Sequence, residues 1–124
     1  KLAVKPHPRE CSERWRHRIE DSQARMQIDI TLCEEPADHL LCWVDGVVGM
    51  TSMVLLEAHL LDIPILSIQS GRTKVVNPVI EDLGQPILDA SEIPKRLLTF
   101  LGKIGQIQTV NPRFSAIMHT QAVL

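Results

Sequence analysis

The stretch Gly49-Met-Thr-Ser-Met-Val-Leu-Leu-Glu57 combines residue types that are suited to holding an anion. Gly49 ends a short apolar run, where backbone can approach a ligand closely. Thr51 and Ser52 follow as signals for the start of a helix, which presents unpaired N–H groups and the positive end of the helix dipole. The stretch therefore predicts a site for a phosphate or diphosphate. The alternative is that Thr51 or Ser52 only caps the helix.

Glu57 lies one to two turns into an otherwise apolar helical segment. An acid is costly to bury there without a partner, so its placement needs a reason. One interpretation is that the carboxylate accepts hydrogen bonds from the two hydroxyls of a ribose. The other is that Glu57 simply faces solvent on an amphipathic helix.

His7 stands between Pro6 and Pro8, directly after the short apolar run Leu2–Lys5. The prolines end the strand and restrict the loop, which leaves the imidazole at the strand's carboxyl end. There it could donate to a phosphate or take part in proton transfer near neutral pH. An inert surface histidine is the alternative.

Composition excludes several function classes. A net charge of −2 with two Trp, two Phe and no Tyr argues against a nucleic-acid partner. The longest apolar stretch, residues 40–56, contains Asp45 and two glycines, so no transmembrane segment is expected. Cys11, Cys33 and Cys42 have no metal-ligand spacing. Their odd number, without a secretory leader, predicts reduced thiols, no metal site and a cytoplasmic protein.

Short apolar runs alternate with helical segments along the 124 residues. The β-branched, Pro-bounded runs predict strands and the capped amphipathic segments predict helices. The predicted strands are 2–5, 28–33, 45–49, 63–69 and 86–89, and the predicted helices are 9–24, 37–43, 53–61, 77–83 and 91–102. Alternation of this kind predicts an α/β domain over residues 1–103, with a parallel sheet of four to five strands between helices. Residues 104–124 are set apart as a C-terminal tail, with a helix as one interpretation.

Five motifs together resemble, in order and spacing, the C-terminal domain of GT-B-type glycosyltransferase-like proteins: Lys5-Pro-His-Pro8, Ala37-Asp38, Val47-Val-Gly-Met-Thr-Ser52, Leu56-Glu-Ala58 and Ile63-Pro-Ile-Leu66. The His-Pro and Ser/Thr pairs are similar to those of bacterial sialyl- and polysialyltransferases and of teichoic-acid glycerophosphotransferases. The Glu-Ala segment resembles that of UDP-N-acetylglucosamine 2-epimerases.

The resemblance implies a Rossmann-like three-layer αβα sandwich that forms half of a GT-B fold. It also implies that His7 contacts the nucleotide or its phosphates and serves catalysis, that Gly49, Thr51 and Ser52 bind phosphate, and that Glu57 holds the ribose. The substrate would be a nucleotide-activated sugar used in cell-surface polysaccharide or glycan synthesis, with no further cofactor.

Two departures from the family pattern matter. Asp62 replaces the glycine that usually precedes the Pro-containing strand, and an aspartate enters a left-handed turn less easily than glycine does. The N-terminal acceptor domain is not part of this chain, which begins at once on a strand. We therefore expect a fragment that binds nucleotide without turnover and self-associates as a homo-oligomer through its uncovered apolar surface. A non-catalytic binding or interaction module and an epimerase relative are the alternatives.

Overall fold

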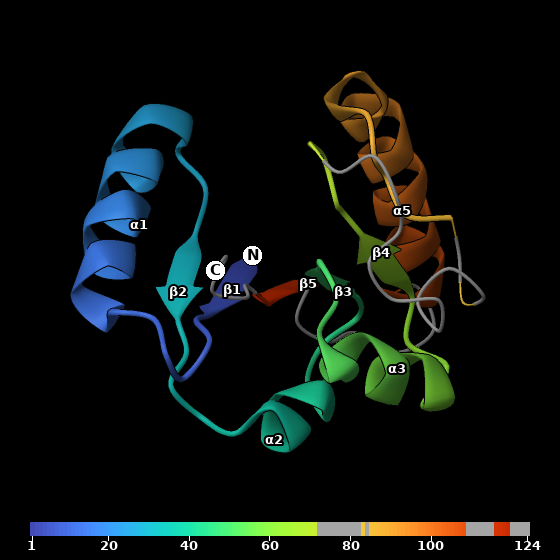
Figure 1. The fold of residues 1–124 in the computed structure, drawn as a ribbon, viewed down its shortest axis with the longest axis horizontal. Helices are drawn as coiled ribbons and strands as arrows, with labels where there is room; N and C mark the ends of the chain where they lie inside the picture. The colour runs from blue at the N-terminus through green and yellow to red at the C-terminus, as the bar shows by residue number, and fades with distance from the viewer. Residues whose placement is uncertain (72–82, 84, 109–115, 120–124) are drawn as a thin grey trace.

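The computed structural model describes residues 1–71, 83, 85–108 and 116–119, in which strands and helices alternate (Figure 1). The prediction of an α/β chain with short parallel strands is confirmed. In chain order the elements are β1 (Leu2–Lys5), α1 (Ser12–Met26), β2 (Ile30–Leu32), α2 (Ala37–Leu41), β3 (Val47–Gly49), α3 (Met53–Leu60), β4 (Ile65–Ser67), the 3-10 helix η1 (Ala90–Glu92), α5 (Ile93–Gln108) and β5 (Ala116–His119).

All strand pairs are parallel, in the order β2-β1-β5-β3-β4. Among the described residues, β5 alone joins the β1–β2 pair to the β3–β4 pair: Lys5 is opposite His119, and His119 is opposite Gly49. The segment set apart as a tail thus contributes the last five residues of α5 and the central strand.

Two other expectations differ from the structure, and a third falls mostly on residues that it does not describe. The strands β2, β3 and β4 have only three residues each, because pairing with the neighbouring strand ends where the chain turns. The expected strand 86–89 is reduced to one bridge between Ile87 and Ile68, since only these residues come into register. Most of the expected helix 77–83 lies outside the described residues.

Alternating strand residues bury their side chains in clusters on opposite sides of the sheet, as the period of two in a strand requires. Ala3 and Val47 pack in one cluster with residues of α2 and α3, namely Leu40, Leu41, Val54, Leu55 and Ala58. Val48 packs with Phe100 and Ile104 of α5, and Val4 packs with Ile19 of α1. Figure 1 shows α2 and α3 together below the strands, with α1 and α5 above them.

The turn after α3 contains the replacement noted in the sequence. Asp62 has a φ of 58°, so the aspartate does adopt the left-handed conformation that glycine enters most easily. Its N–H donates to the His59 carbonyl at 3.0 Å, and the next N–H, of Ile63, donates to the Ala58 carbonyl at 2.9 Å. The helix therefore ends with its last carbonyls satisfied, and the chain passes directly into β4.

Candidate anion site at the carboxyl edge of the sheet

The carboxyl ends of all the strands lie at one edge of a parallel sheet, which is where such sheets bind ligands. This geometry brings the His7 loop, after β1, and the Gly49–Ser52 loop, after β3, to the same edge. Strand β5 separates them, because Lys5, His119 and Gly49 are in register. At about 4.8 Å per strand, the ends of β1 and β3 are roughly 10 Å apart.

The His7 loop is closed by its own hydrogen bonds. The His7 N–H donates to Glu10 Oε2 at 2.9 Å, and the Glu10 N–H donates to the His7 carbonyl at 2.8 Å. The Arg9 N–H donates to His7 Nδ1 at 3.1 Å. Because Nδ1 accepts this bond, the neutral ring carries its proton on Nε2. The half-buried imidazole is thus arranged as an Nε2–H donor.

Ser52 is the N-cap of α3, as the capping interpretation predicted. Its Oγ accepts from the Val54 N–H at 3.2 Å, and its carbonyl accepts from the Leu55 N–H at 3.1 Å. The side chain is almost fully buried, at 5% exposed, whereas Thr51 is half-buried. A hydroxyl that accepts one bond can still donate another. Thr51 is nevertheless the more accessible residue of the two.

Glu57 lies on the exposed side of α3, one turn beyond Met53, which is also exposed. A rise of about 1.5 Å per residue puts it roughly 6 Å along the helix from Met53. The structure therefore places Glu57 on the solvent side of the helix that follows the loop, away from the sheet.

Two residues that the sequence analysis did not single out hold the Gly49–Ser52 loop from behind. Ser67 Oγ donates to the Met50 carbonyl at 2.6 Å, and Gln69 Nε2 reaches the same carbonyl at 3.4 Å. Gln69 Nε2 also donates to Ser67 Oγ at 3.1 Å. Both side chains are buried, at 5% and 1% exposed. The signal in the sequence was two polar residues closing the apolar run 63–69.

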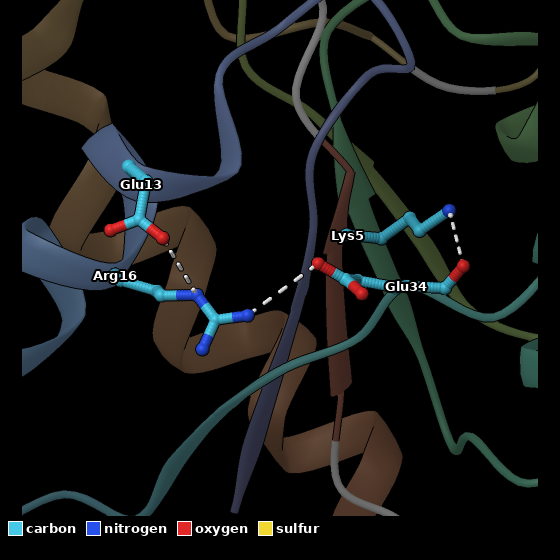
Figure 2. Close-up of polar contacts among 4 residues, drawn as sticks. All are labelled: Lys5, Glu13, Arg16 and Glu34. Atoms are coloured by element: carbon cyan, nitrogen blue, oxygen red, sulfur yellow. Dashed lines mark hydrogen bonds and ion pairs between the residues drawn. The ribbon is translucent and has the colours of Figure 1, made fainter.

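Charged side chains link the ends of β1, β2 and the first turns of α1 (Figure 2). Lys5 Nζ donates to the Glu34 carbonyl at 3.4 Å. Arg16 lies 3.7 Å from both Glu34 Oε1 and Glu13 Oε1. These ion pairs are more than half exposed, so each contributes little to stability. For the site, the relevant charge is that of Lys5, whose ammonium group lies where β1 ends.

Cys33 lines an apolar cavity of about 370 Å³ between the strands and α2. Burial raises the pKa of its thiol, Glu35 raises it further, and Lys5 opposes both. A second cavity of about 290 Å³ lies beside the turn from α3 to β4. The first is lined by Ala3, Thr31, Cys33, Glu35, Leu40, Trp43 and Val44, and the second by His59, Asp62, Ile63, Pro64, Ile65, Leu83 and Lys103. Neither contains His7 or the Gly49–Ser52 loop.

The described residues contain no group of three or more His, Cys, Asp and Glu side chains that could hold a metal ion. Within the same part of the chain, no helix has the length and apolar character to cross a membrane. All three cysteines are free thiols.

No protein-family model matches the chain, and no curated protein or solved structure matches it significantly.

Proposed function

We propose that the chain is the nucleotide-sugar-binding half of a GT-B-type glycosyltransferase-like protein, with a Rossmann-like three-layer sandwich as its fold. One observation carries the proposal: the His7 loop and the start of α3 share the carboxyl edge of a parallel sheet, one strand apart. Buried clusters on opposite sides of the sheet agree with a three-layer arrangement. The left-handed Asp62 agrees with the resembling family's turn.

The ligand would lie across β5, between the two loops. The N–H groups at the start of α3 and the Thr51 hydroxyl would receive phosphate oxygens, with Ser52 shaping the turn as the cap. His7 would approach from the other loop as an Nε2–H donor. All of these are donors aimed at negative charge. They would stabilise the charge that develops on a nucleotide as it leaves the sugar.

Calorimetric titration with CMP, UDP and their sugar conjugates tests this proposal. We expect binding by the unmodified chain, and His7→Ala and Thr51→Val should each weaken it about tenfold, the value of one well-placed hydrogen bond to a charged group. His17→Ala is the matched control, because His17 is an exposed histidine on α1. A chain that binds none of these nucleotides would refute the proposal.

The ribose role of Glu57 needs its own comparison. Glu57→Gln should weaken CMP and UDP but leave inorganic pyrophosphate unaffected, because only the nucleotides carry ribose hydroxyls. Equal effects on all three ligands, or none, would exclude a ribose role and leave Glu57 as a solvent-facing residue of α3 only.

A non-catalytic module of the same fold is the second candidate. It is favoured by the commitment of the Ser52 hydroxyl to capping the start of α3. A chain that folds cooperatively yet binds no nucleotide would support this candidate over the first.

A further inference from the structure

The carbonyl of Met50 is the point at which β4 holds the Gly49–Ser52 loop. It accepts from Ser67 Oγ and from Gln69 Nε2, and the two donors are themselves hydrogen-bonded. One residue earlier, the Gly49 carbonyl accepts from the Ile68 N–H at 2.8 Å. Two consecutive carbonyls of the loop are therefore turned toward β4.

Fixing these carbonyls also fixes the amides that follow them. In a trans peptide the N–H points opposite to the preceding C=O, and no cis peptide occurs among the described residues. The Met50 carbonyl points toward Ser67 and Gln69, so the Thr51 N–H points away from them. The orientation of the first amides before α3 thus depends on side chains two strand positions apart on β4 and its extension.

The burial of Ser67 and Gln69 explains why these two side chains donate to the loop and not to water. Ser67 and Gln69 are nearly inaccessible to solvent, and buried polar side chains are costly unless hydrogen-bonded. An apolar pair would fill the same space at the end of an otherwise apolar strand. What the hydroxyl and the amide add is directional donation to the Met50 carbonyl of the loop.

We propose that Ser67 and Gln69 are positioning residues for the anion site: they hold the Met50–Thr51 peptide so that the Thr51 amide and the start of α3 face the ligand. The positioning itself is a property of the loop. Its effect on nucleotide affinity rests on the function proposed above.

Amide hydrogen exchange over residues 50–54, together with calorimetry using CMP, UDP and inorganic pyrophosphate, tests this. Ser67→Ala and Gln69→Met remove the donors with little change in volume. We expect exchange at 50–54 to accelerate about tenfold, and any ligand that the unmodified chain binds to weaken by a similar factor. Ser67→Thr retains the hydroxyl and should restore both.

Ile19→Val is the matched control, because Ile19 is a buried residue of α1 that packs in a separate cluster. It should lower the melting temperature without selective change at 50–54. Unchanged exchange at 50–54 in Ser67→Ala and Gln69→Met, or an equal rise in Ile19→Val, would overturn the positioning role. So would accelerated exchange that leaves ligand affinity unchanged. If the unmodified chain binds no ligand, the proposed function fails, and exchange alone decides the positioning proposal.

Discussion

The three thiols of this chain differ in their surroundings. Cys11 and Cys42 are exposed, whereas Cys33 is half-buried and its pKa is raised by burial and by Glu35. The thiolate is the nucleophile, so a raised pKa leaves less of the reactive form at any given pH. At pH 8 we expect iodoacetamide to modify Cys11 and Cys42 well before Cys33, with the difference shrinking as the pH rises. Peptide mass spectrometry over time measures the three rates.

The effect of neighbouring charges on the reactivity of Cys33 can be separated from the effect of restricted solvent access by replacing those charged neighbours. Glu35→Gln removes a cause of the raised pKa and should accelerate modification of Cys33. Lys5→Gln removes the opposing charge and should slow it. If neither change alters the rate, the slow reaction comes from restricted access alone.

At the scale of the element, the start of α3 depends on one hydroxyl. Ser52→Ala removes the acceptor of the Val54 N–H and should lower the free energy of unfolding by about 1 kcal/mol. Cys11→Ala is the control, since Cys11 is the N-cap of α1 and makes no side-chain cap bond. Urea unfolding of both variants checks the difference; equal losses would contradict it.

Helix α5 packs closely against the residue before β3. A Cβ at Gly46 would lie 2.6 Å from Phe100 Cζ and from Ile104 Cδ1, two buried residues of α5. These contacts are too short, so Gly46→Ala should cost about 1–3 kcal/mol. Gly105→Ala on α5 meets nothing within 4 Å and should stabilise the helix by about 0.5–1 kcal/mol. Thermal unfolding measures both changes: the melting temperature should fall in Gly46→Ala and rise in Gly105→Ala.

The ends of helices and strands could be predicted from neighbouring residues in the sequence, but contacts between distant residues could not. Pro6 ends β1, Ser52 opens α3 and Asp62 turns left-handed, each for a reason that can be read from neighbouring residues. Ser67 and Gln69 could not be assigned in this way. A polar residue at a strand end usually indicates solvent, and their common acceptor, the Met50 carbonyl, is distant in the sequence.

At the scale of the whole molecule, the sheet is held together at β5. A chain truncated after Gln108 keeps the β1–β2 and β3–β4 pairs but lacks the strand between them. Two-stranded pairs are marginal on their own, so we expect the cooperative unfolding transition to be lost. Urea titration followed by circular dichroism measures it. A chain that ends at His119 is the control, because it retains β5; a cooperative transition in the shorter chain would contradict this role.

Neither β5 nor its central place could be predicted from the sequence. Residues 116–119 form a strand of four residues after an interrupted segment containing Pro112, and short strands give a weak periodic signal. The order of strands in a sheet is set by contacts between distant parts of the chain. Sequence therefore placed the His7 and Gly49–Ser52 loops at one edge, while the strand that separates them came only from the structure.

The central position of β5 also determines when the sheet can close during synthesis. Leu2 pairs with Ala116, almost the full length of the chain away, so β1 emerges from the ribosome long before its inner neighbour exists. Until then, the inner edges of β1 and β3 offer unpaired backbone groups to any other strand. Such long-range closure is slow and exposes the nascent chain to aggregation. The same strand that unites the sheet thus leaves the inner edges of β1 and β3 unpaired until residues 116–119 have been made.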